Sequence, residues 1–309
     1  MPSVDSPLMR QYLEVKEKHP DCLIFFRVGD FYELFFDDAV KAARALDLTL
    51  TSRDKGKEDQ VPMAGVPHHA VRQYVSRAVE QGFKVALCDQ VEDAKLAKGL
   101  VRREVTRIVT PGVILDEEQL DARSGCYLAA VVPGAGAGES VVGLAWLDVS
   151  TGEFAATELG ADEIDDELAR VGPRELLLPS GAEALEGLRR RIRIPITDLP
   201  AGGDHAADRS LLEEALAAPI EEFGLGAWPQ AIAAAAACVR YARTTQPTGA
   251  LPIVRLAAYR AADHLVIDES TQANLELFET LAERKRRGAL LGVLDETRTA
   301  PGARLLRRF

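Results

Sequence analysis

Phe31 and Glu33 are the most informative combination of side chains in this sequence. Side chains alternate along a strand, so the ring and the carboxylate would share one face, while Tyr32 takes the other. Gly29, just before them, permits a bend or bulge and a close approach of the backbone. An exposed ring beside a carboxylate at a bend is an unusual arrangement for a plain core. Spacing alone nevertheless favours the interpretation that Phe31 belongs to the core, as Phe25 or Phe35 would, and that Glu33 is merely solvated.

Asp148 competes with this pair as a candidate for chemistry, because it ends a predicted strand and precedes a hairpin turn. RNase H-like nucleases place a metal-binding aspartate in such a position, and the phosphate-binding turns of actin-like ATPases have a similar sequence. Two-metal catalysis needs several carboxylates that converge on the ions. The nearby Glu153, Glu158 and Glu175 form no recognisable constellation. We therefore interpret Asp148 as a structural residue that hydrogen-bonds its own turn.

Other metal and nucleotide sites are not indicated. His68 and His69 are adjacent and have no third ligand near them in the sequence, so we interpret them as residues at a helix start. The sequence contains no GxxxxGK[ST] motif, and therefore no P-loop. The 4 cysteines form no CxxC pair, which excludes zinc-type spacing and favours free thiols.

Basic side chains in two loops are candidates for contacts with phosphate groups, which supply affinity and salt dependence without sequence information. The net charge of -11 argues at first against a nucleic-acid partner. However, residues 1–115 hold 17 basic and 17 acidic side chains, whereas residues 116–309 hold 20 and 31. The first third is thus neutral on balance, and overall charge excludes little. The candidates are Arg53, Lys55 and Lys57 in one loop and Lys95, Lys98, Arg102 and Arg103 in the other.

The elements of residues 1–115 predict a small mixed α/β domain that ends near residue 112. Ser6 and Pro7 are typical of a helix start, and this helix would run to about Lys18. The apolar run at 22–28 predicts a strand, which resumes after Gly29 and Asp30. Further helices are predicted at 37–46 and 69–81, and further strands at 48–53, 84–90 and 103–110.

Strands and helices alternate in a second unit, which an acidic stretch at 116–121 separates from the first. This alternation favours an α/β layer structure. Strands are predicted at 126–132, 141–149, 153–158, 175–179 and 194–198, and helices at 162–171, 181–191, 208–217 and about 227–244.

A third segment starts near Thr248 with a predicted strand, followed by a helix from Glu269 or Ser270 to Arg287. The sequence ends inside an amphipathic helical pattern without a stop signal, so we expect a truncated protein or a fragment. We also expect the apolar faces of this segment to lack partners. No apolar run of about 18 residues and no signal peptide is present, which predicts a cytoplasmic protein.

Separate motifs along the whole chain carry a family resemblance. They are RVGDFYELFFDDA (27–39), VPMAGVPHHA (61–70), VALCDQ (85–90), RIVTPGV (107–113), GLAWLDVSTGEF (143–154), RTTQ (243–246), LVIDESTQANLEL (265–277) and GVLDETRTAPGARLLRR (292–308). In this order they resemble the N-terminal portion of the bacterial MutS family of DNA mismatch-repair proteins.

The resemblance implies roles for individual residues. In the family, the Phe of a Phe-x-Glu motif wedges into the minor groove and stacks on a mispaired base, and the Glu hydrogen-bonds that base; Phe31 and Glu33 match these positions. Arg103 matches a basic position that is associated with DNA contact. A wedge that unstacks a base step costs roughly a few kcal/mol. A mispair deforms more easily, which gives selectivity without reading a sequence.

The resemblance also implies an architecture of several domains. We expect a mismatch-binding domain at 1–115, an RNase H-like connector domain without the nuclease site at 116–245, and the beginning of an α-helical core or lever domain at 246–309. The family's ATPase and main dimer contacts lie further toward the C-terminus. We therefore expect no enzymatic activity and no cofactor in this chain, and a requirement for ATP and Mg²⁺ in the complete protein.

The partners implied are double-stranded DNA with mismatches or small loops, downstream repair proteins that meet the connector domain, and a second copy in a full-length homodimer. Two other interpretations stay open at this point. One is a metal-dependent nuclease centred on Asp148. The other is a protein-interaction fragment that does not bind DNA.

Overall fold

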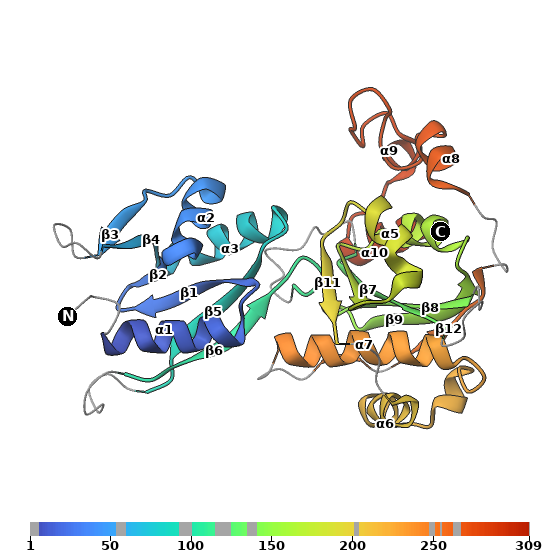
Figure 1. Cartoon of the computed structure of the whole chain (residues 1–309). Helices are drawn as coiled ribbons and strands as arrows, with labels where there is room; N and C mark the ends of the chain where they lie inside the picture. Colours follow the sequence, from blue (N-terminus) through green and yellow to red (C-terminus); the bar gives the residue numbers. More distant parts are fainter. Residues whose placement is uncertain are drawn as a thin grey trace. The chain divides into compact units, whose positions relative to one another are not determined.

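A computed structural model describes residues 6–53, 60–92, 101–114, 125–134, 141–200, 204–246, 251–253, 255–261 and 267–308 (Figure 1). The chain divides into two compact units. The first unit comprises Met1–Pro111 with Arg243–Ala250, and the second comprises Gly112–Ala242 with Leu251–Phe309. The multi-domain α/β class predicted from the sequence is confirmed, while the separate domain expected after residue 245 stays a prediction. Within the described ranges, no helix has the length and apolar character needed to cross a membrane.

The first unit is a mixed sheet in the strand order β3-β4-β2-β1-β5-β6. Only β1 and β5 pair in parallel, and the other neighbours are antiparallel. Helix α1 lies on one face of the sheet, and α2 and α3 lie on the other (Figure 1). The strands are β1 (Cys22–Val28), β2 (Phe31–Phe35), β3 (Thr51–Arg53), β4 (Val61–Pro67), β5 (Lys84–Gln90) and β6 (Arg103–Val109). The helices are α1 (Pro7–Lys18), α2 (Phe36–Leu46), η2 (His68–Ala70) and α3 (Val71–Glu80).

Helix α1 begins as predicted, with Pro7 at its first position and the Ser6 hydroxyl accepting a hydrogen bond from the Met9 amide at 3.3 Å. Its buried Tyr12 ring packs edge-on against Phe35, with ring centroids 5.1 Å apart. The Tyr12 hydroxyl donates to the carboxylate of Asp38 at 2.8 Å. Asp38 is a buried residue of α2, so this hydrogen bond links α1 to α2.

Strand β4 was not predicted from the sequence. This strand contains Pro62, Gly65 and Pro67. Proline and glycine are rare in strands, so they weaken the sequence pattern by which a strand is predicted. Pro62 lies beyond the part of β4 that pairs with β2 and faces only the short edge strand β3, and Pro67 is the last residue of β4. Proline is tolerated in such positions. The pairing of β4 with β2 places the polypeptide around Gly65 directly beside Glu33.

The second unit is also a mixed sheet, in the strand order β11-β10-β7-β8-β9-β12. Strands β7, β8 and β9 form an antiparallel meander, and β10 and β11 continue the sheet in parallel with β7. The strands are β7 (Tyr127–Pro133), β8 (Val141–Asp148), β9 (Glu153–Gly160), β10 (Glu175–Pro179), β11 (Ile196–Leu199) and β12 (Ala257–Ala258). The helices before residue 251 are α4 (Ile164–Val171), η4 (Glu183–Leu185), α5 (Glu186–Arg191), α6 (His205–Leu216), η5 (Ile220–Phe223) and α7 (Pro229–Thr245).

The alanine-rich helix α7 packs closely on one face of this sheet (Figure 1). Small side chains let helix and sheet approach, and the approach is closest at Gly143 in β8. A Cβ atom on Gly143 would lie 2.0 Å from the carbonyl oxygen of Gln230, so this position requires glycine. The opposite face carries a separate core to which α4 and α5 contribute leucine and isoleucine side chains.

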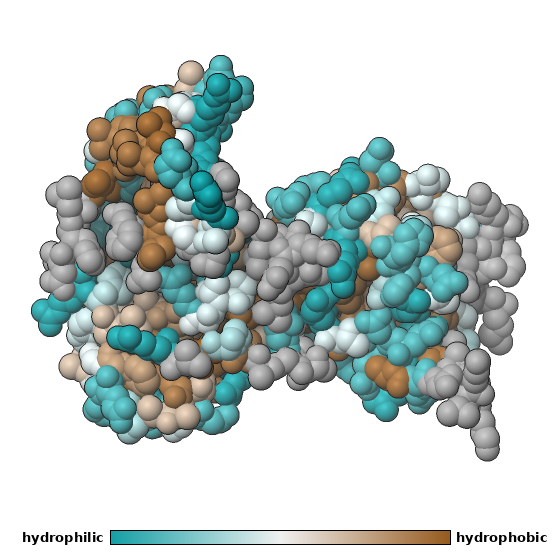
Figure 2. Space-filling model, turned by 180° about the vertical axis from the view of Figure 1, so that it is seen from behind, coloured by the Kyte–Doolittle hydropathy of each residue, from teal (hydrophilic) through white to brown (hydrophobic). Residues whose placement is uncertain are grey.

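The long helix predicted from Glu269 or Ser270 to Arg287 is wrong. Helix α8 ends at Asn274, and Glu276 adopts a left-handed conformation with a φ of 48°. Two short helices, α9 (Leu290–Leu294) and α10 (Ala300–Arg308), follow. Leucine side chains in this segment are exposed, and Figure 2 shows apolar surface at the upper left, over α8 and α9. A helix that buries no apolar face gains little stability from packing. A long helix in this segment would therefore be only marginally stable.

Candidate functional site

A tight hairpin joins β1 to β2 and presents the residues singled out from the sequence. The bend or bulge expected at Gly29 is instead a two-residue turn, because Val28 pairs with Phe31 across Gly29 and Asp30. Gly29 has a φ of 58°, as the first central position of such turns requires. The turn is also held from η2, since the His68 amide donates to the Asp30 carbonyl at 2.8 Å.

Phe31 is the first residue of β2, and its side chain is 48% exposed. The next residue, Tyr32, is 4% exposed, and Leu34 and Phe35 are fully buried. The alternation predicted for this strand is thus confirmed, and the alternative that Phe31 belongs to the core is wrong. Large apolar side chains gain free energy from burial, so a ring held outward at a hairpin is available to a partner.

Glu33 lies on the same face as Phe31 and is half-buried. Its neighbours across the strands are Phe26 in β1 and Gly65 in β4. A Cβ atom built on Gly65 would lie 3.8 Å from Cγ of Glu33, so the glycine leaves space beside the carboxylate. At this position of β4, therefore, no side chain lies beside Glu33.

Arg103 begins β6 and is only 8% exposed, which its sequence position did not suggest. Its Nε donates to the Arg27 carbonyl at 2.6 Å, and one terminal nitrogen donates to the Val101 carbonyl at 2.8 Å. The guanidinium also lies over the Phe26 ring, 5.2 Å from its centroid. Burial lowers the pKa of Arg103, and the negative charge of Glu33 opposes that shift. These contacts support a structural role, and the expected contact with DNA stays a prediction.

The other basic candidates are only partly described. The backbone of Arg53 lies in β3, where it pairs with Val61. Arg102 is exposed and forms an ion pair with Glu104. The remaining candidates fall outside the described residues, and every expected phosphate contact stays a prediction. These are Lys55, Lys57, Lys95 and Lys98.

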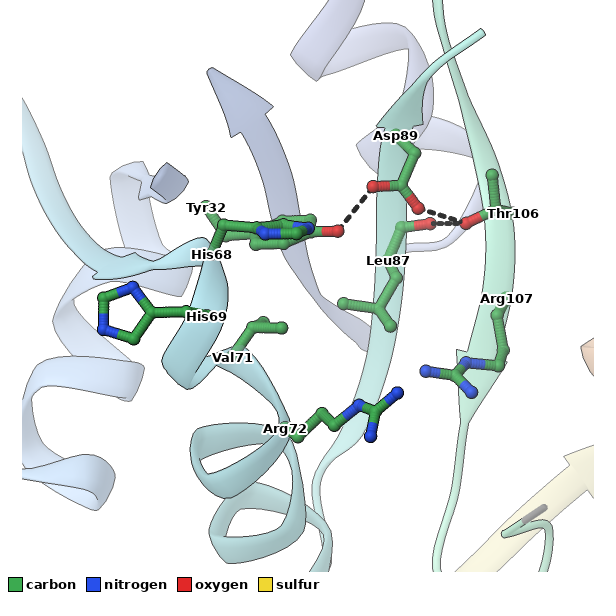
Figure 3. A pocket seen from close by; sticks show the side chains of 9 residues that line it. All are labelled: Tyr32, His68, His69, Val71, Arg72, Leu87, Asp89, Thr106 and Arg107. Atoms are coloured by element: carbon green, nitrogen blue, oxygen red, sulfur yellow. Dashed lines mark hydrogen bonds between the residues drawn. The ribbon is translucent and has the colours of Figure 1, made fainter. Parts of the chain in front are cut away.

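Tyr32 anchors the hairpin from the face opposite to Phe31, a role that the sequence analysis missed. Its hydroxyl donates to Asp89 on β5 at 2.5 Å, and its buried ring stacks on His68 at a centroid distance of 5.8 Å (Figure 3). Arg27 lies over the same ring, 5.4 Å from the centroid. Burial and the bond to Asp89 both raise the pKa of Tyr32, which keeps its hydroxyl a donor. Asp89 also accepts from the Thr106 hydroxyl at 2.6 Å.

Asp148 is buried and hydrogen-bonds its own turn, as predicted. Its Oδ1 accepts from the Ser150 amide at 2.9 Å and hydroxyl at 2.6 Å, and its Oδ2 accepts from the Cys126 amide at 3.1 Å.

The neighbouring carboxylates are likewise used within the protein. Glu158 accepts from the Gln230 amide at 2.6 Å, at the start of α7. Glu175 accepts from the hydroxyls of Thr197 and Tyr241 at 2.6 and 2.7 Å. Among the described residues, no group of three or more His, Cys, Asp or Glu is arranged to hold a metal ion. Nothing therefore supports the nuclease interpretation.

The fold and this site define a class: consecutive mixed α/β units, of which the first presents an exposed ring and a carboxylate on one strand face. Residues 6–118 match the family of MutS domain I, and residues 126–255 match that of MutS domain II. The chain belongs to the MutS family and contains these two domains in this order.

Curated relatives agree with this assignment. The DNA mismatch repair protein MutS of Anaeromyxobacter sp. (strain Fw109-5) is 47% identical over 97% of this chain and 34% of its own length. The proteins of the same name from Myxococcus xanthus and Desulfatibacillum aliphaticivorans are both 46% identical, over 98% and 97% of this chain. The chain thus spans about a third of the length of these relatives, 34% in each case.

Proposed function

We propose that this chain recognises mismatched or looped duplex DNA in mismatch repair, and that Phe31 is the residue inserted at the faulty base pair. The observation that carries the proposal is the 48% exposed ring of Phe31 on a hairpin that is fixed on both sides. An aromatic ring of this kind enters the minor groove, unstacks a base step and kinks the duplex. A mispair resists this deformation less than an intact pair, so deformability supplies the selectivity.

In this proposal, Glu33 hydrogen-bonds the unstacked base and acts against intact pairs. A carboxylate near phosphate groups is repelled unless a base donor or a proton compensates its charge. The open flank at Gly65 supports access of a base edge to Glu33. Arg103 would serve indirectly, because two nitrogens of its guanidinium group already donate to protein carbonyls. Exposed basic side chains such as Arg102 would contact phosphates.

The wider functions belong to the complete protein and are part of the proposal. They are ATP- and Mg²⁺-dependent signalling from a domain outside this stretch, homodimer formation and contact with downstream repair proteins. No catalytic step is assigned to domains I and II themselves.

The decisive experiment compares binding of this chain to a heteroduplex and to the matching homoduplex at one fixed salt concentration. Base stacking on an aromatic side chain contributes roughly 1–3 kcal/mol by alanine substitution. We expect Phe31→Ala to lower the heteroduplex preference by roughly 5-fold or more and to leave homoduplex binding nearly unchanged. Leu50→Ala is the matched control, since Leu50 is also 48% exposed in the first unit. Equal effects of the two variants would exclude Phe31 as the inserted residue.

A further inference from the structure

A hollow lies on the sheet face opposite to Phe31 and Glu33. It has a volume of about 410 Å³ and is bounded by β5, β6 and the η2–α3 junction (Figure 3). Tyr32 and Leu87 form part of its wall, and Arg72 and Arg107 bring two positive charges. The sequence analysis assigned no role to either arginine, and the function proposed above does not use them.

The two guanidinium groups come from different elements and point toward one another across the hollow (Figure 3). Arg72 is the second residue of α3, whereas Arg107 lies in β6, where it pairs with Leu87. Two positive charges therefore face the same space, and an anion held between them would be attracted by both.

Asp89 is the one carboxylate that lines the hollow, as far as the described residues show. Its two oxygens accept from the hydroxyls of Tyr32 and Thr106 at 2.5 and 2.6 Å. Those bonds hold it at the end of the hollow beside Tyr32, and Figure 3 shows the Leu87 side chain between Asp89 and the guanidinium groups. The two arginines outnumber the one aspartate, so these charged side chains of the lining carry a net positive charge.

We propose that this hollow binds a phosphate group between Arg72 and Arg107. Each guanidinium offers several donors in a planar fork. The two oxygens of a carboxylate are taken up by one guanidinium group in a bidentate pair. A phosphate has enough oxygens and charge to bind both guanidinium groups. The group can come from a DNA backbone or from a free phosphate anion, and the same chemistry serves both sources. The proposal stands independently of the role of Phe31.

The first arm of the test titrates inorganic phosphate into the chain by calorimetry at constant ionic strength. We expect saturable binding that Arg107→Gln and Arg72→Gln each weaken roughly tenfold or more, since each removes charge-assisted hydrogen bonds. Arg77→Gln is the control, because Arg77 is exposed on α3 and does not line the hollow. It should leave the binding unchanged, and circular dichroism should show all three variants folded.

The second arm measures homoduplex binding against salt concentration. If the hollow holds a backbone phosphate, Arg107→Gln should reduce the slope of log K against log salt by about 0.9. If it takes only free phosphate, the slope will not change while the calorimetric loss remains. The proposal is overturned if neither measurement depends on Arg72 and Arg107, or if Arg77→Gln has the same effect as they do. The role of Phe31 is tested separately by the heteroduplex preference. A negative result for the phosphate site would therefore leave the mismatch proposal intact.

Discussion

Tyr32→Phe tests whether the anchoring of the hairpin matters for recognition. The change deletes only the hydroxyl that donates to Asp89 at 2.5 Å and keeps the ring that stacks on His68. A hydrogen bond to a charged group contributes roughly 1.5–3 kcal/mol to stability. Asp89 is half-exposed and keeps its bond to Thr106, so water replaces part of the loss. We therefore expect the first unit to lose roughly 1–2 kcal/mol.

Stability is best followed by peptide-resolved hydrogen exchange, because both tryptophans, Trp146 and Trp228, belong to the second unit and would not report on the first. Faster exchange should be concentrated in β2 and its neighbours. A looser hairpin should also hold Phe31 less firmly, and the heteroduplex preference should fall by roughly 2- to 5-fold.

Tyr12→Phe is the control that distinguishes a loss of hairpin anchoring from a general loss of stability of the first unit. The Tyr12 hydroxyl also donates to a carboxylate, that of Asp38, at 2.8 Å, and Tyr12 lies in α1 of the same unit. We expect Tyr12→Phe to cost at least as much stability, because Asp38 is buried, and to leave the heteroduplex preference unchanged. If both variants lower the preference equally, or if Tyr32→Phe leaves it unchanged, the reasoning is refuted.

Three further predictions follow from individual groups. Glu33→Gln should tighten homoduplex binding about 5-fold by removing a repelled charge, and an unchanged heteroduplex-to-homoduplex ratio would remove Glu33 from discrimination. Asp148→Asn should lower the free energy of unfolding by roughly 1–3 kcal/mol in denaturant titrations, because an amide NH₂ would then face the buried Cys126 amide; no loss would contradict the turn role. Burial raises the pKa of Tyr12 and of Tyr32, so the folded state keeps protons that the unfolded state loses above about pH 10. Stability of the first unit should therefore decrease as pH rises through that range, and Tyr12→Phe should flatten the decrease.

Local signals in the sequence predicted much of the fold. The Ser6 cap with Pro7 located the start of α1, and the apolar run before Gln90 located β5 with the bounds that the structure has. The face that carries Phe31 followed from alternation alone. These features depend on neighbours within a few residues, which a sequence displays directly.

Features that depend on distant residues escaped prediction. The bond between Tyr32 and Asp89 joins positions 57 residues apart, and no local pattern announces it. Arg103 was expected at the surface, but its Nε donates to the carbonyl of Arg27, which lies 76 residues away in the sequence. By contrast, a Gly-Asp pair between two strand patterns is a known hairpin signal. The two-residue turn at Gly29 could therefore have been predicted from the sequence.

The hairpin that carries Phe31 has a mechanical consequence. A two-residue turn fixed by a backbone bond to His68, with a stacked and hydrogen-bonded neighbour behind it, yields little when it is pressed against another surface. When a stiff tip meets a duplex, nearly all of the bending happens in the duplex. In the recognition mode proposed for this chain, the affinity for a faulty base pair would consequently follow how easily the duplex bends at that pair. Chemically unrelated lesions that bend equally easily would be bound with similar affinity.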